Sequence, residues 1–343
     1  MSTVLFIHHY NNYSGSTRVL ANVINEEFSD SSDNMILTDM TNEGFLSKLS
    51  IRKSNVPIIR FRGRAIPGIS QIIWSLVGFY KTFYYGRKYD IFYINTIVPV
   101  YAAIVGRLLN KRIIYHVHEA LSSKSCSNRF AVYVFNHIKS ERIFVSEYVK
   151  NYYKEQVGSI SRVVYNKLSR DFVKKVMVKP IEEHHFNTVL MIGSLLEMKG
   201  VLLFRELATR MSNLQFILVV GADIKRINYF FKDDIPSNMH VYPSQVNIHP
   251  FLRDADLLLN LSIPSLCIES FGMTIIEGMA YGLPAIVPNV GGPVELIENG
   301  FNGYCTDPTN IDEVTRLILK SLEPGHYDKM RENALQRSQL YKY

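Results

Sequence analysis

Short runs of apolar residues recur along the chain, separated by longer segments that have the length of helices. Near-continuous apolar runs of this size are typical of parallel strands buried on both faces of a sheet. The alternation of such strands with helical segments predicts an α/β fold with mostly parallel sheets. We expect strands at residues 4–7, 91–94, 112–116, 142–145, 189–192, 216–220, 257–260 and 285–287.

The strand and helix pattern pauses near the middle of the chain, where charged residues surround Pro180. The length of 343 residues fits two domains better than one. We therefore predict an N-terminal Rossmann-like domain over residues 1–165, a linker over 166–187 and a C-terminal Rossmann-like domain over 188–322. Residues 323–343 are expected to form a C-terminal helix that can cross back to the N-terminal domain.

The composition is that of a soluble globular protein, with 47% hydrophobic and 20% charged residues. The three cysteines are far apart and odd in number, which argues against a disulfide framework or a zinc cluster and favours a reducing cytosol. The N-terminus lacks the features of a signal peptide. Polar residues interrupt the most apolar stretch, 66–85, so we predict no transmembrane helix and a cytoplasmic location.

Positive charge is concentrated in the first half of the chain. Residues 1–165 hold 20 Lys and Arg against 11 Asp and Glu, whereas residues 166–343 hold 18 against 20. No recognition motif for nucleic acid accompanies this charge, so an anionic membrane surface is the expected partner. A solvated basic face beside an ordinary core helix is the alternative. The residues that suggest membrane contact are Arg52, Lys53, Arg60, Arg62 and Arg64, followed by Trp74, Phe79, Tyr80, Phe83, Tyr84 and Tyr85.

The segment from Glu269 to Pro284 carries the strongest chemical signal. Its pattern predicts a loop up to Gly272, a helix over 273–281 and a stop at the following glycine and proline. An exposed helix N-terminus at Gly272 would offer the backbone N–H groups of Met273 and Thr274 to a diphosphate, and the glycine would let the ligand come close. Glu269 can accept hydrogen bonds from sugar hydroxyls, and Glu277, in the first turn, from ribose hydroxyls.

These residues resemble a known family. Residues 269–284 read E-S-F-G-x-x-x-x-E-G-M-A-x-G-x-P, which is similar to the signature of the retaining family 4 glycosyltransferases, also called glycosyl transferases group 1. Residues 291–297 and 299–303 resemble the G-G-x-x-E-x-I and N-G-x-x-G segments of that family, and residues 253–256 resemble its A-D step. Residues 193–200 are similar to its G-R-L-x-x-x-K-G loop. The resemblance implies the GT-B fold, in which two Rossmann-like domains face each other across a cleft.

The resemblance also implies roles for single residues. Lys199 would reach the donor diphosphate, while Ser194 stands where the family usually has arginine, which bears on donor affinity. His118, in the segment H-x-H-E, would lie beside the donor sugar, and the loop at Gly15 could approach the donor phosphate or the acceptor. No metal and no cofactor are expected, and catalysis would be a front-face displacement that rests on charge stabilisation and positioning. The catalytic residues would thus be Lys199, Glu269 and His118.

Other residue patterns allow weaker assignments. The Asp254-x-Asp256 spacing resembles a metal motif, but it lies where a helix runs into a strand, so metal binding is disfavoured. Glu119 is either a site residue or a carboxylate at a helix start. His8 and His9 either touch the acceptor or serve as hydrogen-bonded histidines at the end of the first strand.

The expected activity is transfer of a sugar from a nucleotide-sugar donor to a hydroxyl of a glycan or lipid-linked glycan, as in bacterial surface polysaccharide synthesis. The N-terminal domain would take the acceptor and the C-terminal domain the donor, with UDP slightly favoured over GDP. Two other classes stay open: a GT-B-like binding subunit without turnover, and a non-hydrolysing nucleotide-sugar epimerase. The donor base and sugar, the acceptor, the linkage and the oligomeric state are not readable from the sequence.

Overall fold

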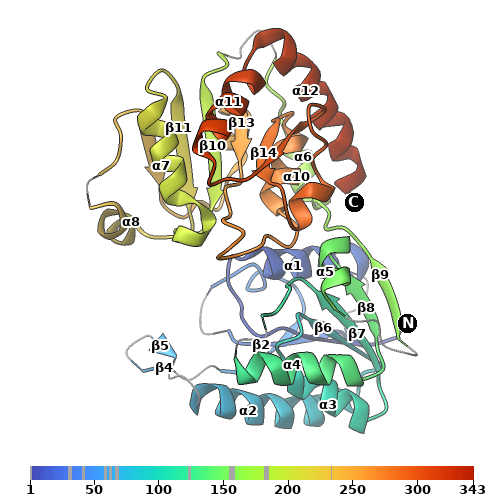
Figure 1. Cartoon of the computed structure of the whole chain (residues 1–343). Coiled ribbons are helices and arrows are strands. Elements are labelled where there is room, and N and C mark those ends of the chain that lie inside the picture. Colours follow the sequence, from blue (N-terminus) through green and yellow to red (C-terminus); the bar gives the residue numbers. More distant parts are fainter. Residues whose placement is uncertain are drawn as a thin grey trace. The chain divides into compact units, whose positions relative to one another are not determined.

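The protein is described by a computed structural model that divides into two compact units, Met1–Asn166 and Lys167–Tyr343 (Figure 1). We call them the N-terminal unit and the C-terminal unit and describe each by itself. The described residues are 2–29, 33–40, 43–57, 60–61, 64–65, 69–122, 125–153, 159–180, 185–232 and 234–343, with backbone only for 60–61, 64–65 and 69–71.

Within the described residues, the N-terminal unit holds a parallel sheet of seven strands in the order β3-β2-β1-β6-β7-β8-β9. Its strands are β1 (Val4–Ile7), β2 (Met35–Thr38), β3 (Arg52–Asn55), β6 (Ile91–Asn95), β7 (Arg112–Val117), β8 (Glu141–Phe144) and β9 (Ile160–Val163). The helices are α1 (Gly15–Glu27), α2 (Ile69–Gly86), α3 (Val100–Leu108), α4 (Cys126–His137) and α5 (Glu147–Tyr152). A short antiparallel pair, β4 (Arg60–Phe61) and β5 (Arg64–Ala65), precedes α2.

The C-terminal unit repeats this plan in its described part, with six parallel strands in the order β12-β11-β10-β13-β14-β15. The strands are β10 (Thr188–Gly193), β11 (Gln215–Val220), β12 (Met239–Tyr242), β13 (Leu257–Leu259), β14 (Ala285–Pro288) and β15 (Gly303–Thr306). The helices are α6 (Arg170–Lys174), α7 (Val201–Arg210), α8 (Ile224–Phe231), α9 (His249–Asp254), α10 (Met273–Ala280), α11 (Ile311–Ser321) and α12 (Pro324–Ser338). Single 3-10 turns are η2 (Glu197–Lys199), η3 (Gly292–Glu295) and η4 (Gln339–Tyr341).

Each sheet has a point at which the strand order reverses. In the N-terminal unit this switch lies between β1 and β6, and in the C-terminal unit between β10 and β13. Ligands of doubly wound sheets bind outside the carboxyl ends of the strands at such a switch. The residues that follow β1 and β6, and those that follow β10 and β13, are therefore the candidates for ligand binding.

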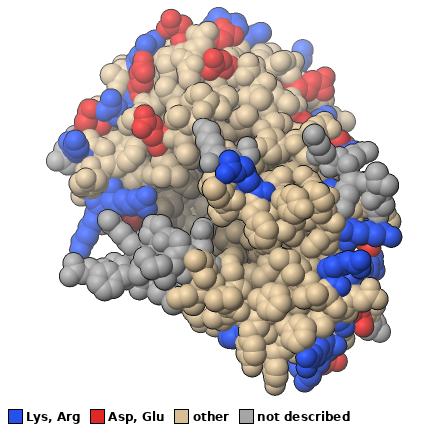
Figure 2. All heavy atoms as spheres, turned by 60° about the horizontal axis from the view of Figure 1, so that its bottom comes forward, with Lys and Arg blue, Asp and Glu red and all other residues tan. Residues whose placement is uncertain are grey.

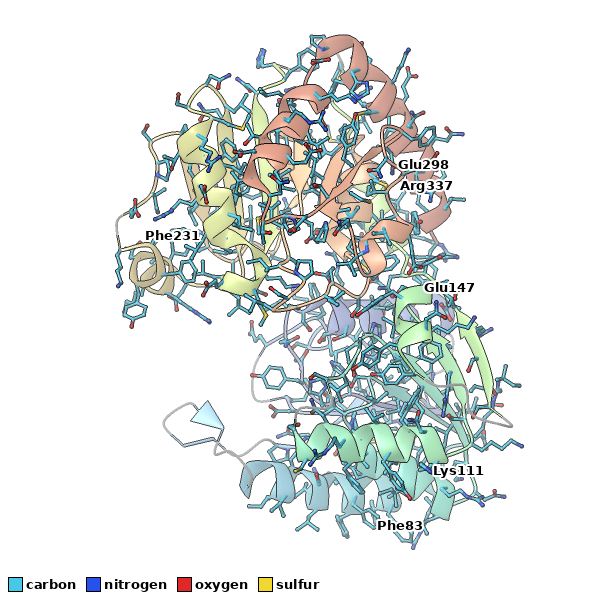
Figure 3. All side chains as sticks on the ribbon, in the orientation of Figure 1. Phe83, Lys111, Glu147, Phe231, Glu298 and Arg337 are labelled. Atoms are coloured by element: carbon cyan, nitrogen blue, oxygen red, sulfur yellow. The ribbon has the colours of Figure 1, made fainter. Side chains whose placement is uncertain are left out.

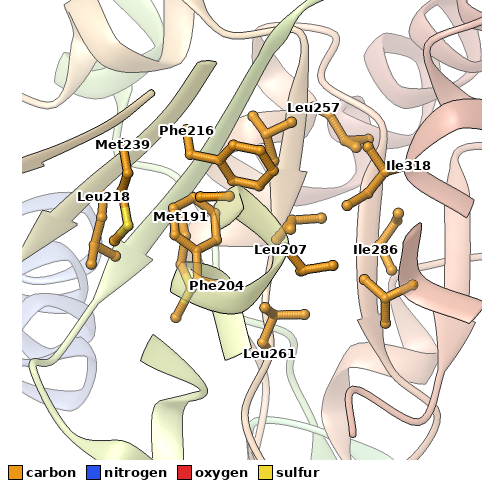
Figure 4. Close-up of a cluster of buried hydrophobic side chains, with 14 of the residues drawn as sticks. Met191, Phe204, Leu207, Phe216, Leu218, Met239, Leu257, Leu261, Ile286 and Ile318 are labelled. Atoms are coloured by element: carbon orange, nitrogen blue, oxygen red, sulfur yellow. The ribbon is translucent and has the colours of Figure 1, made fainter. Parts of the chain in front are cut away.

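A dense apolar core holds the C-terminal sheet in place (Figure 4). Phe204 and Leu207 of α7 lie on Phe216 of β11, and the rings of Phe204 and Phe216 meet edge to face at 5.2 Å between centroids. Ile318 of α11 joins Leu257 of β13 in the same buried cluster. Burial of such side chains stabilises a fold by about 1.5–3 kcal/mol each, so the loops at the carboxyl ends of these strands rest on a rigid base.

The prediction of two α/β units with parallel sheets is confirmed. All eight expected strands are present, but the sequence interpretation missed five other strands of the two parallel sheets, β2, β3, β9, β12 and β15, and also the short pair β4 and β5. In the parallel sheets, β3, β9, β12 and β15 lie at the edges and have mixed polar and apolar residues, whereas β2, which is short and fully buried, lies next to an edge. Strands near an edge need fewer apolar residues, so periodicity alone does not reveal them.

The apolar stretch 66–85 corresponds largely to α2, and none of the described helices is long and apolar enough to cross a membrane. The predicted membrane contact needs correction at Trp74. Trp74 is buried and packs edge to face on Tyr101, with ring centroids 5.0 Å apart. Arg52 forms an ion pair with Asp33 at 2.7 Å. Arg62 and the side chains of Arg60 and Arg64 lie outside the described residues.

The segment predicted as a linker contains α6, whose buried Phe172 lies against the ring of His249. At the other end of the chain, α11 and α12 are separated at Pro324, which begins α12 as its first helical residue. Proline suits this position because its missing N–H has no partner in the first turn of a helix. Helix α12 packs against α10 and α11 of the same unit.

Candidate functional site

The loops that follow β10 and β13 meet at the switch point of the C-terminal sheet. The first loop runs from Gly193 through η2 to Lys199, and the second runs from Leu259 to Glu269 and then into α10. Gly200 joins the first loop to α7 in the left-handed conformation, with φ of 76°. A Cβ atom there would stand 2.1 Å from the carbonyl oxygen of Leu261, so only glycine allows the two loops to approach this closely.

The closest polar contact between these loops joins Lys199 and Glu269. The Lys199 Nζ atom lies 2.7 Å from Glu269 Oε2, and it also reaches Ser262 Oγ at 3.5 Å. Both charged side chains are about a quarter exposed, at 23% and 24%. Burial acts to lower the pKa of Lys199, but the Glu269 carboxylate outweighs it and raises the pKa above its ordinary value. Lys199 is therefore a fixed, accessible cation.

The backbone around Glu269 is held by the glycine pair Gly291 and Gly292. Gly292 N–H donates to the carbonyl oxygen of Glu269 at 2.9 Å. A Cβ atom at Gly291 would lie 2.4 Å from that same oxygen, and one at Gly292 would lie 2.1 Å from the carbonyl oxygen of Ser270. Both positions thus require glycine, which gives this pair a positioning role that the sequence motif alone does not explain.

Helix α10 starts four residues after Glu269, at Met273. Its N-cap residue, Gly272, has φ of 103°, no side chain caps the helix, and no acidic residue occupies its first turn. The positive end of the helix dipole is thus left for an anion. Gly272 itself is buried, which corrects the expected exposure, and its positive φ explains the glycine better than ligand approach does. The partly exposed residues at this helix end are Met273 and Thr274.

Glu277 lies deeper than predicted. It is the fifth residue of α10 and so belongs to the second turn rather than the first, because a turn contains 3.6 residues. Its side chain is almost fully buried, with 1% of its surface exposed. Ser194, by contrast, is exposed directly after β10, and its carbonyl oxygen accepts from Leu196 N–H at 2.8 Å. Ser194 adds no charge to the loop that carries Lys199.

Polar side chains also gather at the switch point of the N-terminal sheet. His118 follows β7, and its Nε2 atom lies 2.8 Å from Asn95 Oδ1 at the end of β6. Asn95 Nδ2 lies 3.1 Å from His8 Nδ1, and His8 Nε2 lies 3.1 Å from Thr17 Oγ1 of α1. Gly15 begins α1 and is exposed. Asn95 was not predicted as a site residue, although a polar residue that closes an apolar strand is a readable signal.

Burial keeps the histidines of this cluster neutral. It lowers the pKa of His8 to about 3, that of His9 to about 4 and that of His116 to about 3, and it also lowers the pKa of His118 well below its usual range. His118 therefore acts as a hydrogen-bonding imidazole at neutral pH. Burial raises the pKa of Glu119 to about 7, although Glu119 Oε1 accepts a hydrogen bond from Ile97 N–H at 3.0 Å.

The Asp254-x-Asp256 motif has a structural use. Asp254 pairs with Arg253, with Nε and Oδ1 2.8 Å apart. Asp256 is buried, and its Oδ2 atom accepts hydrogen bonds from the backbone N–H groups of Asn187 and Thr188, each at 2.9 Å. The motif thus anchors the start of β10 to the end of α9.

The structure brings Lys199, Glu269 and Gly272 together in the C-terminal unit and His118 and Gly15 to the equivalent edge of the N-terminal unit (Figure 3 shows all described side chains). A paired cation and carboxylate beside an uncapped helix end can bind a phosphorylated ligand that also carries hydroxyl groups.

Sequence comparison shows which known proteins this chain resembles. Residues 174–337 match the family model of glycosyl transferases group 1. A sucrose synthase of Denitrovibrio acetiphilus is 43% identical over 74 residues, which are 20% of this chain and 9% of that protein, so the match spans only a small part of its length. An uncharacterized glycosyltransferase of Methanocaldococcus jannaschii is 26% identical over 250 residues, which cover 70% of this chain and 68% of that protein.

Among solved structures, HepE of Anabaena in complex with UDP-glucose superposes with a TM-score of 0.81. Its sequence is 19% identical, and the alignment covers 100% of this chain and 96% of that chain. The two parallel α/β sheets and such neighbours show the GT-B fold. Together with the family model, they support a glycosyltransferase of group 1.

Proposed function

We propose that this protein is a retaining glycosyltransferase of family 4 that moves a sugar from a nucleotide-sugar donor to a hydroxyl of a glycan or lipid-linked glycan. The observation that carries the proposal is the Lys199–Glu269 pair beside the uncapped N-terminus of α10, at the switch point of a doubly wound sheet. A cation and a helix end suit a diphosphate, and a carboxylate suits the hydroxyl groups of a sugar. The diphosphate and the sugar of such a donor would thus each find binding groups at this site.

In this proposal each residue has a distinct task. Lys199 and the N–H groups of Met273 and Thr274 stabilise the diphosphate as it leaves, while Glu269 holds sugar hydroxyls and Glu277 holds the ribose. The leaving diphosphate accepts the proton of the incoming hydroxyl on the same face of the sugar, so the anomeric configuration is retained. Preorganised charges of this kind typically contribute about 10²–10³ to the rate, and the reaction requires no metal.

A UDP-sugar is the donor class we favour, since a structural neighbour of the same fold is solved with UDP-glucose. GDP-sugars are the alternative. His118 of the N-terminal unit, a neutral imidazole fixed by Asn95, is assigned to the donor sugar, and Gly15 to the donor phosphate or acceptor. We further propose that the acceptor is a lipid-linked oligosaccharide of a bacterial surface polysaccharide and that the enzyme works at the inner face of the membrane.

The first test is a binding and turnover screen. Thermal shifts of the purified protein with UDP, GDP, dTDP, ADP and CMP and their sugars identify the donor, because a ligand that binds only the folded state raises the melting temperature. Release of the nucleoside diphosphate is then followed with and without glycan acceptors. Lys199→Met should lower kcat/KM about 100-fold or more. Lys225→Met, which removes an exposed lysine on α8, is the matched control and should behave as wild type.

The outcomes separate the function classes. Acceptor-dependent release of the diphosphate, with a retained anomeric configuration in the NMR spectrum of the product, supports the proposal. Binding without release of diphosphate points to a binding subunit, and conversion of the donor sugar without an acceptor points to an epimerase. Full activity of Lys199→Met in a folded protein would show that Lys199 does not contribute to the site.

A further inference from the structure

The helices α2, α3 and α4 of the N-terminal unit pack side by side (Figure 1), and they carry large apolar side chains that are exposed to solvent. Several large side chains on it are between 54% and 67% exposed. On α2 they repeat every fourth residue, which places them in one stripe along the helix. We call this surface the aromatic face; its most exposed members are Ile72, Leu76, Tyr80, Tyr84, Leu108, Phe130 and Tyr133.

The rings of this face are arranged in pairs rather than scattered. Tyr80 and Tyr84 stack with their centroids 6.3 Å apart, and Phe79 and Phe83 stack at 6.5 Å. Phe83 lies on the outer side of α2 (Figure 3), and the guanidinium of Arg87 lies 4.5 Å from the centre of its ring. Exposed apolar patches of this extent on a soluble protein generally mark an interaction surface.

The charges around the aromatic face all favour an anionic partner. The sequences of α2, α3 and α4 contain no Asp and no Glu. Figure 2, which brings this side of the molecule forward, shows a broad uncharged surface bordered mainly by Lys and Arg. The face is thus apolar at its centre and basic along its margin.

A basic pocket of about 280 Å³ adjoins the aromatic face where α3 ends. Among the described residues that line it, Glu141 is the one acid, and Glu141 is paired with Arg112 at 2.5 Å. The other charged groups of the lining are Arg107, Lys111 and Lys139. Arg107 of the pocket and Leu108 of the aromatic face are neighbours at the end of α3, which places the pocket at the margin of this face.

We propose that this surface docks the protein onto an anionic lipid bilayer, with the aromatic rings at the boundary between headgroups and acyl chains and the basic pocket around a lipid phosphate. Tyrosine suits this boundary because its ring is apolar and its hydroxyl remains hydrated. Lys and Arg near the margin add attraction to anionic headgroups. A second copy of this chain fits poorly, because two such faces in contact would bring their basic margins together.

Vesicle co-sedimentation tests this docking without any need for the transferase reaction. Vesicles of phosphatidylcholine alone are compared with vesicles that also contain phosphatidylglycerol. The wild-type protein should bind the anionic vesicles at least tenfold more strongly. Tyr80→Ser/Tyr84→Ser should lose most of this binding, whereas Tyr229→Ser, which replaces an even more exposed tyrosine on α8, should keep it.

The pocket is tested separately with Lys111→Gln and Lys139→Gln, each of which should weaken binding to anionic vesicles about fivefold and leave the weak binding to neutral vesicles unchanged. Unfolding curves check that every variant is folded. Equal binding of the wild type to both vesicle types overturns the proposal, as does wild-type binding by Tyr80→Ser/Tyr84→Ser. If the same double substitution instead dissolves a dimer seen by light scattering, the face joins protein copies and the membrane assignment is wrong.

Discussion

Replacing Glu269 with glutamine should have opposite effects on two related ligands. In the structure Glu269 holds Lys199 through a contact of 2.7 Å. A nucleoside diphosphate must share or displace that contact, since the proposed diphosphate partner is the same ammonium group. A complete nucleotide sugar also places hydroxyl groups where the carboxylate can accept their hydrogen bonds. Glu269→Gln should therefore tighten binding of UDP but weaken binding of the UDP-sugar.

The size of each effect follows from the geometry. A phosphate oxygen on the far side of the Lys199 ammonium would stand on the order of 5–6 Å from the carboxylate, and the repulsion at that distance is between about 0.7 and 3 kcal/mol for dielectric constants from 80 to 20. Because the pair is about a quarter exposed, we expect a value near 1 kcal/mol, or roughly fivefold tighter UDP. The lost hydrogen bonds to the sugar cost about 2 kcal/mol. The affinity for the UDP-sugar relative to UDP should thus fall about 30-fold.

Isothermal titration calorimetry with UDP and with the UDP-sugar measures both affinities. Lys199→Met should weaken both ligands about 30-fold, since it removes a charge-assisted hydrogen bond that both use. Glu332→Gln, an exposed carboxylate on α12, is the control for the change in net charge. If Glu269→Gln weakens UDP and the UDP-sugar to the same extent, Glu269 only positions Lys199, and its assignment to the sugar is refuted.

Three further predictions concern stability and the donor loop. Burial keeps the pKa values of His8, His9 and His116 low in the folded protein, so these imidazoles stay neutral while those of the unfolded chain gain protons near pH 6.5. The stability that they contribute above pH 6.5 is therefore lost as the pH falls, by about 1 kcal/mol for each histidine between pH 6.5 and 5.5. Glu119, whose pKa is raised, offsets about one of these losses. Urea unfolding followed by the fluorescence of Trp74, the single tryptophan, measures this loss in the N-terminal unit, and a flat profile would contradict it. Gly200→Ala should cost roughly 2–4 kcal/mol by calorimetry because its Cβ meets Leu261, whereas Gly300→Ala, with a similar φ and open space, should cost about 1. Ser194→Arg should bind UDP about tenfold more tightly, because it adds a cation to the loop that carries Lys199. Leu196→Arg, at another exposed position of the same loop, is the control and should leave the affinity for UDP unchanged. Equal effects of the two substitutions would show that position 194 does not face the diphosphate.

Much of the candidate site was accessible from local sequence. The spacing between Glu269 and Glu277, the glycine before the helix and the lysine ahead of α7 are all short-range features, and the chemistry of each residue follows from its type. Local sequence also places His118 at the end of a buried strand. What spacing could not give is depth: the side chain of Glu277 is almost fully buried, because α10 packs against the sheet and α12.

Contacts between segments that are distant in the chain could not be predicted from local sequence. Lys199 and Glu269 are 70 residues apart, and only the neighbouring positions of β10 and β13 in the sheet bring them to 2.7 Å. The membrane-like stretch shows the same limit. Its composition predicted contact for Trp74 and Tyr80 alike, yet packing on Tyr101 buries the first ring and leaves the second in solvent. Helical periodicity does not say which side of a helix the rest of the protein covers.

The sequence by itself determined the alternation of strands and helices, the two α/β units and the residue types available for phosphate and sugar binding, because each depends on neighbours within a few positions. The tertiary structure alone decided which strands lie at the edges, which carboxylate pairs with Lys199, and which aromatic rings stay exposed beside the basic pocket. These properties depend on the order of strands in the sheets and on burial, which are set by contacts between segments far apart in the chain.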